Sequence, residues 1–332
     1  MRIKNHYVPK AYLKQWATDG KVATYSLLVS NDRIAPWKHR SLKAIAFHEH
    51  LYTQIVGGTE NDEFERWLDS RFEAPAEASI QRAIADLGMT RDDWRTLIRF
   101  AFAQDVRTPA RLREFLRRQA MDLPTQLDQI LRNAVKKLEE DRLAVAPGES
   151  VSSAGFPLRV RIEEEDGEVG SIRAETVVGR KLWLWGLRHL LTTTIDKIPY
   201  KGWSIRRSAP GYTWPTSDNP LIRLSYFSRY NYSLSGGWGV PNGDILLPLS
   251  PTRIMHVCVG RRAPTEDRPL DPTTTELISQ IIIENADRYV FSAQPFNIQR
   301  VRQRLVDRDL YNAERRMWEA WGYEQALVER DA

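Results

Sequence analysis

The chain has 332 residues, 42% of them hydrophobic, which is enough to bury a large core in one domain or in two interleaved ones. Its 48 Lys and Arg against 43 Asp and Glu give a formal net charge of +5, an excess that permits a polyanionic partner such as nucleic acid without requiring one. The single cysteine, Cys258, excludes an intramolecular disulfide framework and, with no signal peptide and no bilayer-spanning apolar run, favours a cytoplasmic protein without a membrane partner.

The first part of the chain is expected to be mainly helical, with a small β element near its start. A short helix is followed by two short strands at residues 21–27 and 51–53. Apolar residues then recur every three or four positions in a helix from Asn61. A second amphipathic helix begins at Thr90, with Asp93 three residues later in a pattern close to a capping box.

The second part of the chain is expected to be richer in strands. A Pro-, Gly- and Ser-rich loop at residues 146–155 separates it from the first part. Residues 171–195 predict a long, largely apolar helix that would be central and buried. Five strands then follow, at residues 202–207, 212–216, 221–224, 244–249 and 253–259.

These elements predict an α+β fold in which a helical N-terminal half packs on a mainly antiparallel β-sheet C-terminal half. Residues 1–145 would form the helical region with its small β element. Residues 156–305 would form an α+β region, and residues 306–332 a charged C-terminal extension. The alternative is a single intertwined domain, because the boundary between the two halves need not be a domain boundary.

The sequence Ser217-Asp218-Asn219-Pro220 predicts a tight polar corner after a strand. Asp218 and Asn219 can bond to their own backbone, and the proline after Asn219 restricts that residue to extended geometry. A carboxylate and an amide are thereby held in a fixed direction at a strand edge. This arrangement is typical either of a functional site or of a plain turn.

Four short motifs occur along the chain in this order: Asn5-His6-Tyr7-Val8-Pro9, Gln104-Asp105-Val106-Arg107-Thr108-Pro109, Thr216-Ser217-Asp218-Asn219-Pro220 and Leu247-Pro248-Leu249-Ser250-Pro251. With them the chain resembles the domain-of-unknown-function 4238 family over roughly residues 3–294. The resemblance also matches Glu65 and Glu73 to paired glutamates on a helix, and Asn285 to a late Asn motif. It implies a shared fold unit in a mostly bacterial family without an established activity. Trp16 stands where the family often has Phe, which is a conservative difference.

Histidine and glutamate side chains are candidates for acid–base or metal chemistry. His6 precedes an aromatic helix and would be either a general base or metal ligand, or a hydrogen-bonded core histidine. Glu65 and Glu73 lie about 80° apart around a helix, so they either point toward one cleft or form a solvated acidic stripe. His48 and His50 would face the same way on extended chain, which suits co-ligation of a metal, although a solvated turn also accounts for them.

Gln104 and Arg107 lie three residues apart and therefore share one face of a helix whose other residues look buried. Polar groups in such a place need partners. Arg107 either pairs with Asp218, bridging distant parts of the chain, or binds a substrate phosphate. Asn219 is the third expected substrate contact, beside Gln104 and Arg107.

The sequence lacks a phosphate loop, a dinucleotide fingerprint, a Gly-x-Ser-x-Gly elbow and a His-Glu-x-x-His helix, which excludes the best-marked enzyme classes. Dispersed polar residues suit acid–base or metal-assisted phosphodiester chemistry, so one hypothesis is an enzyme that processes nucleic acid or another phosphodiester, in phage defence or as a toxin-like effector. His6, Glu65, Glu73 and Asp218 would be catalytic, with Mg²⁺ or Mn²⁺ as the expected divalent cation. The alternative hypothesis is a non-catalytic binding or assembly module in which the same residues form a structural polar core.

Overall fold

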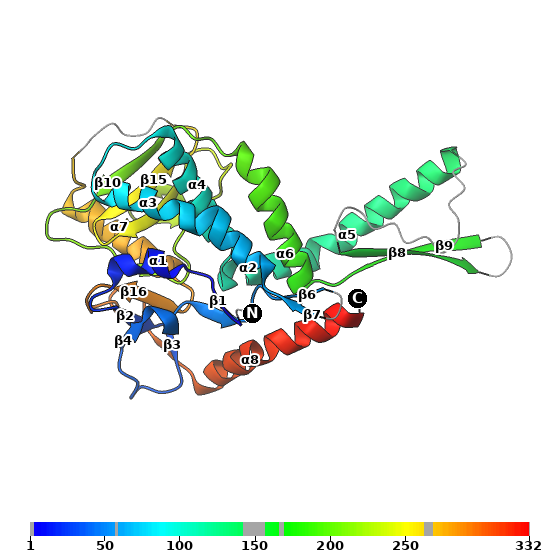
Figure 1. Ribbon diagram of the computed structural model, residues 1–332, viewed down its shortest axis with the longest axis horizontal. Helices are drawn as coiled ribbons and strands as arrows, with labels where there is room; N and C mark the ends of the chain where they lie inside the picture. Colours follow the sequence, from blue (N-terminus) through cyan, green and yellow to red (C-terminus); the bar gives the residue numbers. More distant parts are fainter. Residues whose placement is uncertain (1–2, 57–58, 142–156, 166–168, 262–267, 332) are drawn as a thin grey trace.

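The structure is a computed structural model that describes residues 3–56, 59–141, 157–165, 169–261 and 268–331 (Figure 1). Its body contains two larger antiparallel sheets with helices packed around them, and a long helix and a hairpin project from the body as an arm. The loop predicted at residues 146–155 lies outside the described residues. The division into regions at residues 1–145, 156–305 and 306–332 stays a prediction.

The first part of the chain contributes many strands, so the predicted layout of a helical N-terminal half on a C-terminal β-sheet half is wrong. The backbone groups of a strand are satisfied mainly by pairing with another strand, and two early strands, β2 and β3, have partners late in the chain. The fold is therefore mixed α/β, with the two parts of the sequence interleaved. Seven strands lie within residues 4–61: β1 (Lys4–His6), β2 (Lys21–Ser26), β3 (Leu28–Val29), β4 (Trp37–Ser41), β5 (Phe47–Glu49), β6 (Gln54–Val56) and β7 (Thr59–Asn61).

A four-stranded sheet joins the two parts of the chain in the order β11-β16-β2-β4, with every pair antiparallel. Its late members are β11 (Thr216–Ser217) and β16 (Tyr289–Ser292). Another early strand, β3, pairs in parallel with β17 (Leu305–Val306), whereas β1 pairs with β5 and β6 with β7. The start of the chain is thus held in place by segments made after residue 215.

A five-stranded antiparallel sheet has the order β10-β15-β14-β12-β13, and its central strand, β14, is buried on both faces. Alternate residues of β14 serve the two faces: Ile245 and Leu247 pack in the main core, and Leu246 packs against α7 (Pro272–Asn285). This double burial explains the nearly continuous apolar run in β14. The strands of this sheet are β10 (Trp203–Arg207), β12 (Ile222–Ser228), β13 (Asn231–Ser233), β14 (Gly243–Ser250) and β15 (Arg253–Cys258).

The helix expected from Asn61 forms in three consecutive pieces. They are α2 (Glu63–Leu68), a π-helical turn η3 (Asp69–Glu73) and α3 (Ala74–Ile84). The π turn ends just before Pro75, whose ring nitrogen has no hydrogen to donate to the regular helix ladder.

Two further helices of the first part meet at the segment that carries Arg107. The predicted capping box of Thr90 and Asp93 is confirmed and begins α4 (Arg91–Val106). Helix α5 (Pro109–Asp141) follows directly, with proline at its first position, where the missing N–H is tolerated. Shorter helical segments of the first part are α1 (Lys10–Leu13), η1 (Lys14–Trp16) and η2 (Leu42–Ala44).

The prediction of a single long helix at residues 171–195 is wrong. Its first residues belong to β9 (Val169–Thr176), which pairs with β8 (Leu158–Glu165) in the hairpin of the arm (Figure 1). Residues 171–175 alternate polar and apolar side chains, which fits a strand better than a helix. The helix begins later, as α6 (Arg180–His189), and continues through η4 (Leu190–Thr194) and η5 (Ile195–Lys197).

The charged C-terminal extension contains a long helix, α8 (Arg308–Asp331), which runs along the edge of the body (Figure 1). Its close packing is visible at Gly322, where an added Cβ would come within 2.9 Å of the Cβ of His50. Because α8 lies against strands from the start of the chain, it helps to build the candidate site described below.

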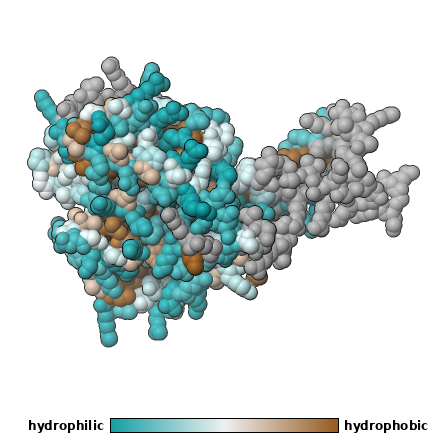
Figure 2. Space-filling model, in the orientation of Figure 1, coloured by the Kyte–Doolittle hydropathy of each residue, from teal (hydrophilic) through white to brown (hydrophobic). Residues whose placement is uncertain are grey.

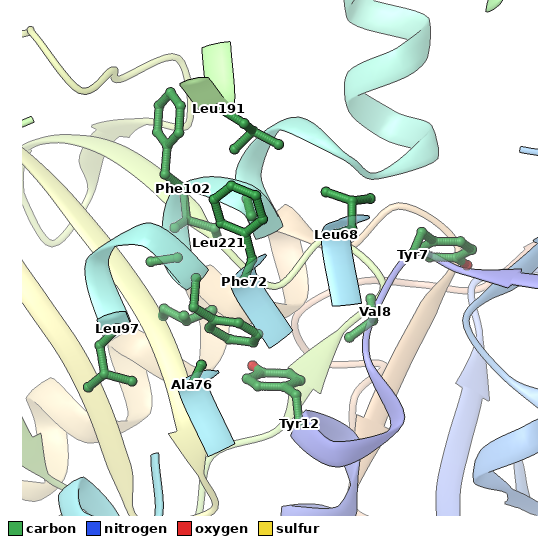
Figure 3. Packing of buried hydrophobic residues seen from close by; sticks show 14 of the residues in the cluster. Tyr7, Val8, Tyr12, Leu68, Phe72, Ala76, Leu97, Phe102, Leu191 and Leu221 are labelled. Carbon is green, nitrogen blue, oxygen red and sulfur yellow. The ribbon is translucent and has the colours of Figure 1, made fainter. Parts of the chain in front are cut away.

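The main core is formed by apolar side chains of the early helices, α6 and one face of the five-stranded sheet. Tyr12 lies within this cluster and Tyr7 at its edge, with the phenol oxygen of Tyr7 directed away from the core (Figure 3). The coloured part of the face shown in Figure 2 is mostly hydrophilic, with hydrophobic residues in small scattered patches. Within the ranges that the structure describes, no helix is both long and apolar enough to cross a membrane.

Candidate active site

Arg107, which follows α4, is fully buried and ties three segments together. Its guanidinium donates hydrogen bonds to Glu73 Oε1 at 2.6 Å, to the His6 backbone carbonyl at 2.5 Å and to the Tyr52 hydroxyl at 3.4 Å. The carboxylate that pairs with Arg107 is therefore Glu73 and not Asp218. The predicted bridge to Asp218 is wrong, because Asp218 bonds to other segments.

Glu65 joins the same buried network through Asn5. Asn5 donates to Glu65 Oε2 at 2.6 Å and accepts from the backbone N–H of Tyr52 at 3.0 Å. Burial raises the pKa of the Tyr52 hydroxyl to about 12, although Arg107 acts in the opposite direction. Three predicted site residues thus place their side chains around Tyr52: Glu65, Glu73 and Arg107. His6 joins this network only through its backbone carbonyl, and its ring packs against Phe47 at a centroid distance of 5.7 Å.

This Tyr52 network is closed to solvent over most of its extent. Glu65 is 7% exposed and Arg107 is 0% exposed, whereas Glu73 reaches the wall of a cavity of about 700 Å³ beside α1 and α3. Gln104 is also 0% exposed, and among the described residues neither its Oε1 nor its Nε2 has a hydrogen-bond partner. The structure therefore places the predicted substrate contacts Gln104 and Arg107 in the interior.

Asp218 fastens the end of β11 to the start of β16. Its Oδ1 accepts the backbone N–H of Asp287 at 2.9 Å, and its Oδ2 accepts that of Arg288 at 2.8 Å. Each carboxylate oxygen has a second lone pair, so these two bonds leave capacity for another contact. The corner predicted from the sequence is thus a clamp between segments about 70 residues apart.

Asn219 completes the clamp by a reciprocal pair of hydrogen bonds with Asn285, the last residue of α7. Asn219 Nδ2 donates to the Asn285 carbonyl at 3.1 Å, and Asn285 Nδ2 donates to the Asn219 carbonyl at 2.7 Å. Thr108 also donates to Asn219 Oδ1 at 3.2 Å, which links the corner to the segment that carries Arg107. Asn219 is therefore a structural contact in the described residues.

A pocket of about 420 Å³ lies next to the clamp, and Asp218 is part of its wall. Segments from the whole length of the chain contribute to it: the residue after β1, strands β4, β5 and β16, the start of α5, and α8. The residues that matter for its chemistry are Tyr7, Arg40, His48, Arg113, Asp218, Asp287, Arg288, Tyr289, Glu314 and Trp318.

Burial and the neighbouring carboxylate of Asp287 raise the pKa of Asp218 to about 7, although three backbone hydrogen bonds act in the opposite direction. Burial, and next the charge of Asp218, also raises the pKa of the Tyr7 and Tyr289 hydroxyls. At neutral pH the pocket therefore holds a carboxyl group that is present in both protonation states, beside two protonated phenols.

His48 contributes a neutral imidazole to the same pocket. Burial, followed by the nearby charge of Arg113, lowers the pKa of His48 to about 4. Its ring packs between Trp318, at a centroid distance of 3.9 Å, and Tyr7, at 6.0 Å. These two rings belong to residues near opposite ends of the sequence.

Helix α8 closes one side of the pocket and is fastened at both ends. Near its start, Glu314 forms a bidentate ion pair with Arg288. Near its end, Glu329 accepts two hydrogen bonds from Arg180, at 2.9 and 2.8 Å, and the side chains of this pair are only 0% (Arg180) and 7% (Glu329) exposed. Trp318 lies between the two anchors and covers His48.

The expectation that His48 and His50 face the same way is wrong. His50 has a φ of 54°, in the left-handed region, so the extended alternation ends there. Its ring lies near Thr53 and Glu60, away from the ring of His48. Among the described residues, no group of three or more His, Cys, Asp or Glu side chains is placed to hold a metal ion.

Of the residues that matter for the chemistry of this pocket, Asp218 and His48 were singled out from the sequence, whereas the tyrosines and Trp318 were missed. Tyr7 and Tyr289 lie inside two of the segments that carry the family resemblance, next to His6 and after Asn285, and this position was the available signal. No such signal in the sequence marks Trp318, because its role depends on a contact with His48, which is 270 positions earlier in the chain.

The comparison with protein families gives one match, described as "Protein of unknown function (DUF4238)", over residues 4–295. This range contains the Tyr52 network and the Asp218 clamp, and it ends before α8. A search of curated proteins and a search of solved structures found no match.

Proposed function

The chain belongs to the DUF4238 family of proteins of unknown function, and from the geometry of its pocket we propose that it is an enzyme in which Asp218 transfers protons during cleavage of a phosphodiester. One observation carries this proposal: a buried carboxyl group in a pocket wall has a pKa of about 7. A general acid or base works best when its pKa lies near the operating pH, and such shifted groups gather at functional sites.

In the proposed reaction, ionised Asp218 takes a proton from a water molecule as the water oxygen bonds to phosphorus. The bond from phosphorus to the leaving oxygen breaks, and the leaving oxygen takes a proton from solvent. Asp218 then returns its proton to solvent, so the net reaction consumes one water. Tyr7 and Tyr289 would donate hydrogen bonds to the phosphoryl oxygens, where negative charge increases in the transition state.

The proposal assigns a different task to the other predicted site residues. His6, Glu65, Gln104, Arg107 and Asn219 do not line the Asp218 pocket, and Glu73 lines a different cavity. We propose that these six residues position the segments that carry the pocket. The reaction is written with the side chains of this chain alone, and an Mg²⁺ or Mn²⁺ ion stays a hypothesis without an assigned site.

The substrate class rests on the four arginines in the pocket wall and on the net charge of +5. This proposal suits a cytoplasmic enzyme that acts on foreign nucleic acid, in phage defence or as a toxin-like effector. Nucleic acid is here a proposed source of the phosphodiester.

The test is hydrolysis of bis(p-nitrophenyl) phosphate, DNA and RNA by the full chain, with and without Mg²⁺. We expect a rate that rises with pH through about 7, as Asp218 ionises, and a loss of at least about a hundredfold in Asp218→Asn. Thermal unfolding of the variant checks that it folds. Hydrolysis at the wild-type rate by folded Asp218→Asn, or no hydrolysis of any of these substrates by the wild type, would overturn the proposal.

One observation favours the alternative of a non-catalytic binding or assembly module: both oxygens of Asp218 already accept backbone hydrogen bonds. If Asp218 has only this structural role, Asp218→Asn would change the stability of the protein. The wild type would have no hydrolytic activity for the variant to lose. Stability and hydrolysis measured on the same variant separate the two functions.

A further inference from the structure

Arg40, in β4, lies in the wall of the Asp218 pocket without a carboxylate partner. In the part of the chain that the structure describes, its side chain has no ion pair or hydrogen bond. It is partly buried, so this charge is only partly solvated. The other three arginines of the pocket are paired, Arg113 with Asp287, Arg288 with Glu314 and Arg315 with Glu319.

The register of the four-stranded sheet directs Arg40 toward the same side as Asp218. Arg40 stands opposite Val22 and Tyr289 opposite Ser26, and these two residues of β2 are an even number of positions apart. Opposite and alternate residues share a face of a sheet. Asp218 stands opposite Tyr289 at the end of β11, where its N–H donates to the Tyr289 carbonyl at 3.1 Å.

The acids around Arg40 do not neutralise it. Asp287, Glu314 and Glu319 are paired with other arginines, and Glu49 is exposed. Asp218 is the remaining acid of the pocket wall, and both its oxygens already accept backbone hydrogen bonds. The hydroxyl of Tyr289 is the neighbour that Arg40 acts upon, because the charge of Arg40 lowers a pKa that burial raises. A guanidinium and a phenol hydroxyl on one sheet face are both hydrogen-bond donors.

A partly buried guanidinium without a counter-ion is unfavourable, and its planar fork matches the oxygens of a phosphate. We propose that Arg40 and Tyr289 form the phosphate-binding subsite of this pocket, and that the substrate is a small, nucleotide-sized molecule with a single phosphodiester. This inference rests on the proposed function and narrows its substrate.

The size and charge of the pocket support a small substrate. Its volume of about 420 Å³ lies in the usual range of roughly 300 to 1,000 Å³ for small-molecule sites. Proteins that bind long nucleic acids commonly neutralise roughly six to ten phosphates, whereas this pocket offers one unpaired arginine. One free cation matches one phosphate group.

The experiment is isothermal titration of the full chain with a dinucleoside monophosphate, which has one phosphodiester, at neutral pH and low salt. Asp218→Asn is titrated in parallel, so that binding is measured without turnover. We expect Arg40→Gln to weaken binding at least about tenfold, Arg40→Lys to recover part of the loss, and Tyr289→Phe to weaken it less than Arg40→Gln. Arg300→Gln, which removes an exposed arginine from a groove lined by residues 297–306, is the matched control and should bind like the wild type.

Three results would overturn the inference: no binding by the wild type up to millimolar concentration, equal binding by folded Arg40→Gln, or equal binding of the two nucleosides without phosphate. Binding that depends on Arg40, without hydrolysis by the wild type, would keep the subsite and reject the reaction assigned to Asp218. Preference for a long oligonucleotide over the dinucleoside monophosphate by more than the number of phosphates would reject the small substrate.

Discussion

The raised pKa of Asp218 makes the stability of the protein depend on pH in an unusual direction. A carboxyl group whose pKa is higher in the folded state than in the unfolded chain binds its proton more tightly when folded, so it stabilises the fold most at low pH. For a pKa that moves from 3.8 to about 7, the full difference is about 4 kcal/mol. This contribution is complete below about pH 3.8 and is lost as the pH rises to about 7.

Between pH 5 and pH 8 the loss amounts to about 2.5 kcal/mol, because part of the transition lies below pH 5. The perturbation that reveals it is Asp218→Asn, which has no proton to lose over this range. Urea unfolding of both proteins at several pH values gives their free energies of unfolding. We expect the wild type to lose about 2.5 kcal/mol relative to the variant from pH 5 to pH 8, whatever the constant difference between them.

A second variant identifies the cause of the shift. Asp287→Asn removes the negative charge that is, after burial, the second cause of the raised pKa of Asp218. The pH-dependent loss of stability should therefore become smaller without disappearing. A difference between wild type and Asp218→Asn that stays constant from pH 5 to pH 8 would refute the reasoning. Asp218 would then be ionised in the folded protein over the whole range and unsuited to proton transfer near neutral pH.

Three further variants test the buried networks and the cover over the pocket. Arg107→Met leaves a carboxylate and a backbone carbonyl without their buried partner, and should lower the free energy of unfolding by about 3 to 5 kcal/mol in urea; a loss below about 1 kcal/mol would contradict it. Asn285→Ala removes both side-chain bonds that hold the Asn219 corner and should destabilise by about 1 to 3 kcal/mol, with the melting temperature as the measure and no change as the opposing result. Trp318→Ala uncovers His48, so NMR titration should show the pKa of His48 rising from about 4 toward its ordinary value; an unchanged pKa would mean that α8 is not what buries it.

Local signals in the sequence predicted local structure well. The Thr90 and Asp93 cap was predicted because the residues that form it are three positions apart. The Asp218 corner was expected to bond to its own backbone, whereas both oxygens of Asp218 accept hydrogen bonds from residues about 70 positions later. The arrangement of the halves was wrong because β2 pairs with β16 at a distance that no periodicity records. Which strands pair depends on how distant segments pack in the folded chain, and a local sequence pattern does not contain this information.

The partner of Arg107 shows the same limit at a single side chain. A buried arginine predicted a carboxylate partner, and the structure has one, the partly buried Glu73. Glu73 and Asp218 were equally acceptable in charge, and only the approach of η3 to the end of α4 selects Glu73. The sequence thus predicted that polar groups would converge, whereas the choice of partner depends on the three-dimensional packing of the helices.

The assembly of the pocket from both Tyr7 and Trp318 has a consequence for protein synthesis. These residues are roughly 300 positions apart, and a ribosome that adds about 5 to 20 residues per second needs roughly 15 to 60 s to pass from one to the other. For most of that interval the aromatic rings near the start of the chain have neither α8 nor β16 to cover them. The pocket is therefore not assembled while the chain is being synthesised. The exposed aromatic side chains would form a surface that a chaperone can bind.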